Sequence, residues 1–313
     1  MSTTEYIYTY TWHKDEYDLS RMEMRSFFGF DVPLNALKSS VQIDPSRSPF
    51  IKQRLEVIFE GENVEQLARL VEQLDLGGAT FKVSCLNKLE LNSTQKIGHS
   101  KRNEIERTIG LCIQGEPDLI HPQLDFGVVT LDDKWYFGKL ELNEAVWLQH
   151  QQKPEMYSTA LSTRVARAVA NIAVPNPEGF RVIDPCCGIG TVLVEALSMG
   201  IDIEGRDINP LVVYGSRKNI AHFGLQGNVT IGPIEEAEGN YDVAIIDMPY
   251  NLFTHITADS QQAIITEARR ITKKIVIVTI DTIDHMIEAA GFEILDRCVA
   301  KKGTFERQIL FCN

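Results

Sequence analysis

The second half of the chain contains three short motifs whose residue types suit nucleotide-like ligands and amine chemistry. The first is DPCCGIGT, residues 184–191, between an expected strand and an expected helix. Its glycines let the backbone approach a ligand closely, and the N-terminus of the following helix points amide donors at an acidic or polar group. Taken alone, this turn is compatible with NAD binding and also with a simple tight turn.

The second motif is GRDIN, in which Asp207 ends the next expected strand. It follows the glycines by about 20 residues, the place where a carboxylate can hold ribose hydroxyls. Asp207 is also placed to cap the helix that Pro210 opens. The two roles do not exclude each other.

The third motif, DMPY at residues 247–250, ends the fourth expected strand. At this edge of a sheet, an Asp carboxylate and an adjacent backbone carbonyl can accept both N–H bonds of an exocyclic amine and draw its lone pair out of conjugation. Tyr250 can stack on the base, a contact worth about 1–3 kcal/mol. A polar turn after a strand is the simpler interpretation, but the three motifs in this order favour methyl transfer to an amine.

The elements that position these motifs alternate between strand and helix. Apolar runs predict strands that begin near residues 181, 202, 228, 241 and 273, each followed by a helix or turn, and the chain closes with two strands joined by KKGT. This alternation predicts an α/β fold with a parallel, doubly wound sheet, to which the final hairpin adds one antiparallel strand. Lys301, Lys302 and Arg307 in this hairpin could contact phosphates or could be ordinary charged residues of a hairpin tip.

The first half reads as a mixed α+β unit. Strands are expected at 5–11 and near residues 81, 127 and 134, with helices over 61–75 and from Glu106 onward. The last strand pattern ends near Glu144 to Lys153, and we place the domain boundary between residues 147 and 148.

Composition excludes several classes of protein. The 313 residues include 31 Lys and Arg against 43 Asp and Glu, a net charge of −12, which argues against a generally basic nucleic-acid binder. No apolar run approaches the roughly 18 residues of a membrane span, and no signal peptide is expected. Six scattered Cys are typical of reduced thiols, so we expect a cytoplasmic protein, and no Cys or His spacing suggests a metal site. One window, 81–107, is basic in this acidic chain; its exposed helix face could simply be solvated.

The ordered motifs resemble those of the THUMP-containing RNA methylases, which use S-adenosylmethionine to methylate guanosine N2. The sequence is most similar to the branch that acts on position 10 of tRNA. The resemblance implies a C-terminal Rossmann-like class I methyltransferase domain over 148–313, with a seven-stranded sheet and final antiparallel hairpin. It also implies an N-terminal α+β region, 1–147, with a THUMP-like RNA-binding domain that measures RNA shape.

The resemblance also implies roles for individual residues. Asp247, Met248, Pro249 and Tyr250 correspond to the catalytic Asp-Pro-Pro-Tyr. Residues 153–164 resemble the stretch that contacts the cofactor before the first helix of the catalytic domain. The expected cofactor-binding residues are Asp184, Cys186, Gly188, Gly190, Thr191, Asp207, Ile208, Ile234, Ser158 and Leu161. The expected RNA-binding residues are Lys82, Lys88, Lys96, Lys101, Arg102 and Arg107.

Two positions depart from the family pattern. Met248 replaces the first proline of the catalytic motif, which keeps the backbone carbonyl but loses a fixed φ. The acidic residue that usually binds the adenine amino group is absent near Pro233, where Ile234 could pack on the ring or Glu235 could substitute.

These departures leave two other functions open. An adenine-N6 methyltransferase would use a similar motif, and a degenerate methylase fold could serve only to bind RNA. Some relatives need a small activator protein, which no feature of this sequence requires or excludes.

Overall fold

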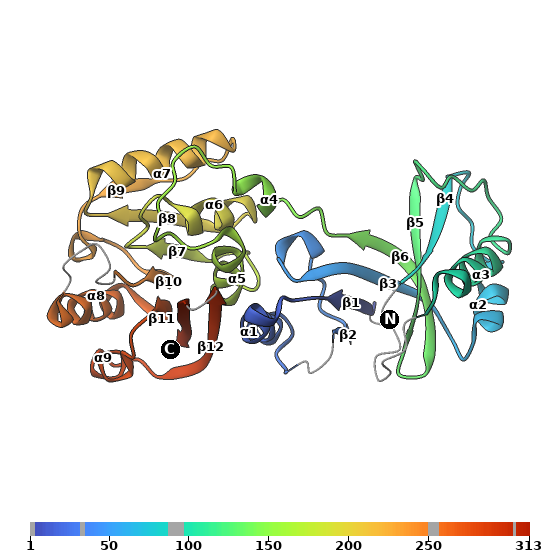
Figure 1. Ribbon diagram of the computed structural model, residues 1–313, viewed down its shortest axis with the longest axis horizontal. Helices are drawn as coiled ribbons and strands as arrows, with labels where there is room; N and C mark the ends of the chain where they lie inside the picture. The colour runs from blue at the N-terminus through green and yellow to red at the C-terminus, as the bar shows by residue number, and fades with distance from the viewer. Residues whose placement is uncertain (1–3, 32–34, 87–96, 250–256, 303–304) are drawn as a thin grey trace. The chain divides into compact units, whose positions relative to one another are not determined.

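The chain forms two compact units. The computed structural model describes residues 4–31, 35–86, 97–249, 257–302 and 305–313 (Figure 1). The first unit comprises Met1–Thr11, Val32–Ser46 and Phe50–Glu144, and the second comprises Trp12–Asp31, Arg47–Pro49 and Ala145–Asn313. This division differs from a single boundary after residue 147, because a helix from the first 31 residues packs within the second unit.

The first unit is built on a six-stranded sheet in the order β2-β1-β3-β6-β5-β4. Neighbouring strands pair antiparallel, except for the parallel pair β4–β5. The strands are β1 (Tyr6–Tyr10), β2 (Ala36–Ser39), β3 (Ile51–Gly61), β4 (Phe81–Cys85), β5 (Leu124–Leu131) and β6 (Lys134–Leu142). The helices are α2 (Val64–Val71) and α3 (His99–Gly110), with a 3₁₀ turn, η2, at Pro45–Arg47.

Helices α2 and α3 share one apolar core with the sheet. Asn63 caps α2 by accepting a hydrogen bond from the Gln66 N–H at 2.8 Å. Helix α3 begins seven residues before Glu106, the start expected from sequence. Strand β1 was expected to bury one face, but the structure buries both. The Tyr8 hydroxyl donates to the Val41 carbonyl and accepts from the Ile43 N–H, and these bonds hold that segment over the strand.

The second unit contains a seven-stranded sheet in the order β12-β13-β11-β10-β7-β8-β9. Only β13 runs antiparallel to both of its neighbours, so the predicted doubly wound sheet with a terminal hairpin is confirmed. The strands are β7 (Arg181–Asp184), β8 (Asp202–Asp207), β9 (Val229–Ile231), β10 (Tyr241–Asp247), β11 (Thr272–Thr279), β12 (Ile294–Lys302) and β13 (Phe305–Cys312).

Helices cover both faces of this sheet (Figure 1). Helices α1, α5, α6 and α7 contact one another in that order, and α8 and α9 form a separate pair. The helices are α1 (Tyr17–Phe28), α4 (Trp147–His150), α5 (Thr163–Ala173), α6 (Thr191–Ser198), α7 (Pro210–His222), α8 (Ala258–Ile271) and α9 (Asp284–Ala289), with 3₁₀ turns η1 (Lys14–Glu16) and η3 (Ile234–Glu236). Strand β10 alternates toward the two layers: Ala244 and Ile246 pack with α8 and α9, and Val243 and Ile245 project to the other face. None of the helices in the described ranges is long and apolar enough to cross a membrane.

A buried polar cluster ties the helices of one layer together. Glu195 of α6 accepts hydrogen bonds from Arg167 of α5 at 2.8 Å and contacts the His150 ring at 2.8 Å. Glu23 of α1 is also buried, and it accepts hydrogen bonds from Asn171 at 2.7 Å and from Ser48. Burial raises the pKa of Glu23 to about 7. Helix α1 is therefore held in the second unit by polar as well as apolar contacts.

Replacing Glu195 with alanine is expected to destabilise the protein by about 3–5 kcal/mol, because it leaves the Arg167 guanidinium buried without its counter-charge. Urea unfolding followed by far-UV circular dichroism measures this loss. Glu288→Ala on the exposed face of α9 serves as the control and should change stability by no more than about 0.5 kcal/mol. A loss below about 1 kcal/mol for Glu195→Ala would show that water or other groups compensate Arg167.

Candidate active site at the carboxyl edge of the second sheet

Three carboxylates end three neighbouring strands of the second unit. Asp184 ends β7, Asp207 ends β8 and Asp247 ends β10, and these strands are adjacent in the order β10-β7-β8. All three therefore lie at the carboxyl edge, where doubly wound sheets bind ligands. The pKa of Asp184 lies well above its ordinary value, because the side chain is buried and the charges of Asp247 and Asp207 oppose its ionisation.

The glycine motif forms a tight turn between β7 and α6. Gly188 and Gly190 have φ values of +52° and +75°, which a residue with a Cβ adopts only under strain. A Cβ on Gly190 would also clash with the Ser216 hydroxyl, whereas the space beside Gly188 is open. Asp184 accepts a hydrogen bond from the Cys186 N–H at 3.2 Å, which fixes the start of the turn. Thr191 is buried as the first residue of α6.

Asp207 connects the glycine turn to the next strand end. Its Oδ2 accepts from the Gly188 N–H and its Oδ1 from the Asn209 N–H, both at 2.9 Å. Burial raises the pKa of Asp207 above its ordinary value. The capping role considered for Asp207 belongs to Asn209, whose side chain accepts from the Leu211 N–H at 3.0 Å. The Asp207 carboxylate is thus oriented by backbone contacts at the mouth of the site.

Asp247 differs from the other two carboxylates in its hydrogen bonding. Its Oδ1 is buried, and no hydrogen-bond donor reaches it from the described residues. Burial raises the pKa of Asp247 to about 7, and the charge of Arg307 opposes that rise. A buried acceptor without a donor costs free energy, so such an atom is suited to a ligand that brings an N–H group.

The next two residues of the motif are held by neighbouring elements. The Met248 N–H donates to the Val278 carbonyl of β11 at 2.8 Å, and Gln261 of α8 donates to the Pro249 carbonyl at 3.1 Å. Met248 is buried in the core beneath the edge. Tyr250 lies outside the described residues.

The segment before α5 runs beside the same edge. Asn219 of α7 is fully buried and bonds the backbone of Glu155 through both atoms of its amide, at 2.9 and 3.0 Å. It also donates to the Ile189 carbonyl in the glycine turn at 2.9 Å. Arg307 donates to the Thr159 carbonyl at 3.0 Å, so this arginine of the terminal hairpin contacts the segment near the site. Within the segment Leu161 is buried and Ser158 is exposed.

The remaining cofactor candidates divide by exposure. Ile208 is 72% exposed directly after Asp207, which leaves an apolar side chain at the edge. Ile234 is only 3% exposed and packs in the core with the strands and α8, so little of it is accessible to a ligand. Burial raises the pKa of the Cys186 thiol well above its ordinary value, and the charges of nearby carboxylates, Glu235 among them, add to the rise. Glu235 and Glu236 are both exposed, and the Glu236 carboxylate pairs with Arg206 at 3.0 Å.

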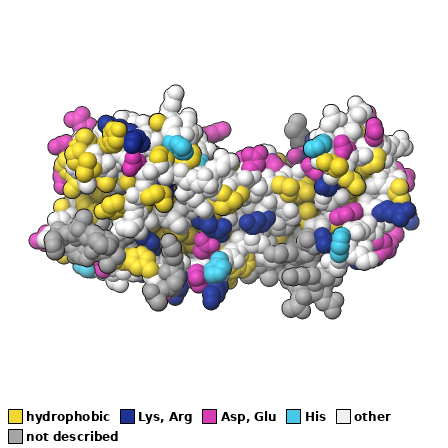
Figure 2. Space-filling view, turned by 45° about the horizontal axis from the view of Figure 1, so that its top comes forward, with side chains coloured by type: hydrophobic (Ala, Val, Ile, Leu, Met, Phe, Trp, Pro, Cys, Tyr) yellow, Lys and Arg dark blue, Asp and Glu magenta, His cyan; other side chains and the backbone are white. Residues whose placement is uncertain are grey.

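The basic window of the first unit is split between two faces. Phe81, Val83 and Cys85 of β4 pack with Ile105 and Ile109 of α3, so the alternating Lys82 projects from the opposite face of the sheet. The other described basic residues of the window lie on α3, namely Lys101, Arg102 and Arg107. The Lys101 ammonium pairs with the Glu104 carboxylate at 3.1 Å. Lys88 and Lys96 lie outside the described residues. Figure 2 shows one side of the molecule, on which Lys and Arg side chains are mixed with Asp and Glu side chains.

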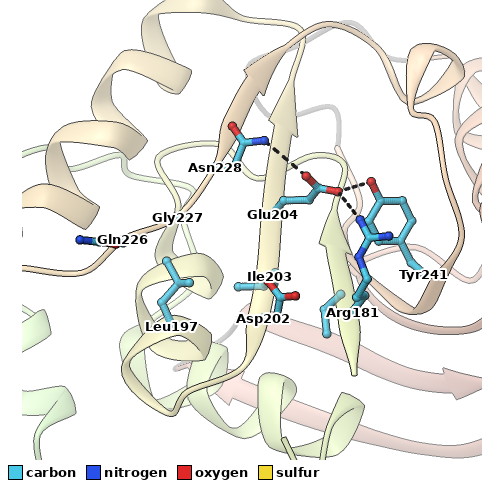
Figure 3. Close-up of a pocket in the computed structure, with 10 residues that line it drawn as sticks. Arg181, Leu197, Asp202, Ile203, Glu204, Gln226, Gly227, Asn228 and Tyr241 are labelled. Atoms are coloured by element: carbon cyan, nitrogen blue, oxygen red, sulfur yellow. Dashed lines mark hydrogen bonds and ion pairs between the residues drawn. The ribbon is translucent and has the colours of Figure 1, made fainter. Parts of the chain in front are cut away.

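A small cavity of about 150 Å³ lies at the other edge of the second sheet. Its lining includes Arg181 and Asp202, which begin β7 and β8 (Figure 3). Glu204 accepts from the Tyr241 hydroxyl and from Asn228, and it pairs with Arg181, so these polar groups satisfy one another. The cavity is therefore distinct from the three strand ends. In the described ranges, no cluster of three or more His, Cys, Asp or Glu side chains could hold a metal ion.

Comparison with known proteins identifies the part of the chain that carries this edge. Residues 151–293 match the UPF0020 family, described as an RMKL-like methyltransferase domain. This match covers a little less than half of the chain.

Curated relatives match part of the chain. A tRNA (guanine(10)-N2)-dimethyltransferase from Methanothermobacter thermautotrophicus is 27% identical over 177 residues, which cover 52% of each protein. The human U6 snRNA (guanine-N(2))-methyltransferase THUMPD2 is 26% identical over 187 residues, which cover 55% of this chain and 34% of the relative. The chain thus spans about half or less of the length of these relatives. A solved structure, TrmN from Thermus thermophilus, aligns over 99% of each chain with a TM-score of 0.49 and 16% identity.

Within residues 151–293, sequence reasoning missed Asn219 and Gln261. Both are amide side chains on helices, and both are buried with hydrogen bonds to loops at the carboxyl edge. Their spacing on α7 and α8 offered no signal, because an amide on a helix is ordinarily exposed. Arg307 was noticed as a basic residue of the hairpin, but its contact with the segment before α5 requires the fold.

Proposed function

We propose that this chain methylates the exocyclic N2 amine of a guanosine in structured RNA, with tRNA as substrate and position 10 as the modified nucleotide. The observation that carries the proposal is the buried Asp247 Oδ1, which has no donor from the described residues and ends the strand that leads into Met248-Pro249. The similarity to guanine-N2 methyltransferases of tRNA and U6 snRNA supports this choice of amine.

The cofactor is S-adenosylmethionine, and the residues at the edge fit it. When bound, it supplies an electrophilic methyl group on a positively charged sulfur. The three neighbouring carboxylates form a site that favours a cation. Burial raises the pKa values of Asp207 and Asp247, and burial together with neighbouring charges raises that of Asp184. Asp207 would accept hydrogen bonds from the ribose hydroxyls, and the open space beside Gly188 admits the ligand to the backbone.

The adenine ring would rest on the apolar side chain nearest to the ribose site. Ile208 is exposed and follows Asp207, so it is the best-placed contact. Glu235 would bind the adenine amino group in place of the acidic residue that is absent near Pro233. Ile234 supports η3 from within the core instead of touching the ring.

Asp247 and Met248 would bind the substrate amine. The Asp247 carboxylate accepts one N–H and the Met248 carbonyl accepts the other, which draws the nitrogen lone pair out of conjugation. Asp247 Oδ1 then takes the proton that the methylated nitrogen releases. Tyr250 is proposed to stack on the extruded guanine.

The rate of transfer is expected to rise with pH through about 7 and then level off, because only ionised Asp247 can accept both the N–H and the proton. Because the pKa of Asp247 is raised to about 7, protonation of its carboxylate below that pH removes the proton acceptor. The positive cofactor favours the ionised form, so the inflection in kcat should lie below that in kcat/KM. Single-turnover rates from pH 5.5 to 8.5 measure both, and a flat profile would contradict the assignment.

The first unit is proposed to be the RNA-binding part, a THUMP-like domain. Its basic helix α3 would contact phosphates through Lys101, Arg102 and Arg107. Lys82, Lys88 and Lys96 remain candidates from sequence, with Lys82 on the opposite face from α3. The protein is proposed to act in the cytoplasm, with or without a small activator protein.

Methyl transfer to unmodified tRNA transcripts, followed by nucleoside mass spectrometry, tests the function. N2-methylguanosine is the expected product. A methylated adenosine would overturn the guanosine assignment and favour the adenine-N6 alternative. Tight tRNA binding without any product, with purified cofactor and every transcript tried, would favour a fold kept for binding alone.

A further inference from the structure

Two hydrogen bonds hold the turn that follows Asp247. The Met248 N–H donates to the Val278 carbonyl at 2.8 Å, and the Gln261 side-chain amide donates to the Pro249 carbonyl at 3.1 Å. The first bond continues the parallel register of β10 and β11 one residue beyond the pair Asp247–Val278. The second comes from α8, on the side of the sheet that carries the large apolar core.

The bond from Met248 needs a residue with an N–H group. Proline at this position, as in the motif that the sequence resembles, has a fixed φ but no donor. Methionine loses that fixed φ and gains a hydrogen bond to the neighbouring strand. The hydrogen bond from Met248 to Val278 therefore restrains the turn here, as the fixed φ of a proline would at the same position.

The two carbonyls of the turn have different partners. Gln261 occupies the Pro249 carbonyl, whereas no donor among the described residues reaches the Met248 carbonyl. Gln261 is only 7% exposed, so its amide must find a partner and has few alternatives. The contact therefore takes up the Pro249 carbonyl and leaves the carbonyl of Met248, the residue that follows Asp247, for an incoming N–H.

We propose that Gln261 is a positioning residue for methyl transfer: by holding the Pro249 carbonyl, it fixes the turn so that Asp247 Oδ1 and the Met248 carbonyl can bind one amine together. The effect on methyl transfer rests on the proposed function, whereas the hydrogen bond from Gln261 to the Pro249 carbonyl does not depend on it. Gln261 touches neither substrate nor cofactor in this arrangement, so its effect should fall on the rate of transfer and leave ligand affinity unchanged.

The neighbouring Gln262 offers a matched control. Its side-chain amide donates to the Met286 carbonyl of α9 at 3.1 Å, away from the strand ends. Gln261→Leu is expected to slow single-turnover methyl transfer to tRNA by about 10- to 100-fold, within the range for a misplaced reacting group. Affinities for S-adenosylmethionine and tRNA should stay within twofold, and Gln262→Leu should leave the rate within twofold. If Gln261→Leu lowers the thermal midpoint, Gln261→Met replaces it, since methionine has a similar length and no donor.

A second readout does not depend on catalysis. Selective ¹⁵N-methionine labelling resolves the Met248 amide, whose hydrogen exchange reports opening of its bond to Val278. Exchange should be at least tenfold faster in Gln261→Leu and unchanged in Gln262→Leu. If wild-type protein transfers no methyl group to RNA but this acceleration is seen, the proposed function fails and the positioning contact stands. An active wild type, with neither rate nor exchange altered by Gln261→Leu and Gln261→Met, would overturn the inference.

Discussion

Replacing Asp247 with asparagine is expected to lower the rate of methyl transfer by about 10²–10⁴-fold, the usual contribution of a positioned proton acceptor. Asparagine has nearly the same shape but carries no charge and cannot take the proton. Asp247→Ala should abolish transfer in the same way. Single-turnover kinetics on a tRNA transcript measures the rate, and calorimetry with S-adenosylmethionine should show that binding persists.

Asp281 provides the control for Asp247. It follows β11 at the same edge of the sheet, its side chain is exposed, and its hydrogen bonds there are made by its backbone. Asp281→Asn should transfer methyl at the wild-type rate. Loss of cofactor binding and transfer together in Asp247→Asn would indicate misfolding, and unchanged transfer would remove Asp247 from the mechanism.

Replacing Asp207 with alanine is expected to weaken binding of S-adenosylmethionine by about 30- to 1000-fold, which corresponds to about 2–4 kcal/mol. Under the proposed function, the variant loses the acceptor for the ribose hydroxyls. It also releases the Gly188 and Asn209 N–H groups, so the glycine turn loses its anchor. Calorimetry gives the dissociation constant, and filter binding should give unchanged affinity for tRNA.

The same strand contains the matched control. Asp202 begins β8 at the opposite edge, where it lines the small cavity and is exposed (Figure 3). Asp202→Ala should bind cofactor as the wild type does. Equal affinities for Asp207→Ala and wild type would show that the ribose lies elsewhere.

The second unit could be predicted from sequence because each of its strands is a short apolar run that ends in a turn signal. The run at 241–247 ends at Pro249, and α7 begins at Pro210 as expected. These local signals also fix which residues stand at strand ends, so the amino-acid sequence alone is enough to place the three carboxylates at one edge. The alternation of strand side chains also allows a prediction that Lys82 projects from the face opposite to its neighbours Phe81 and Val83, which are buried.

Contacts between distant residues could not be predicted in this way. Helix α1 buries Glu23 against Asn171, a pair separated by 148 residues, and no periodicity within 17–28 indicates which unit the helix joins. Gln261 and Asn219 present the same difficulty, since their partners are backbone carbonyls of loops that lie 12 and 30 residues away in the sequence. The expected start of α3 at Glu106 was late because its first turn, with His99 and Lys101, has little apolar character.

The membership of α1 in the second unit has a consequence for synthesis on the ribosome. Residues 17–28 emerge early, but their partner α5 comprises residues 163–173. At about 5–20 residues per second, the helix waits on the order of 10 s before α5 has been made. During that interval the apolar side of α1, with Leu19, Met22 and Phe27, has none of its α5 contacts. The second unit therefore closes late in translation, and its earliest segment is the one most exposed to misassociation in the nascent chain.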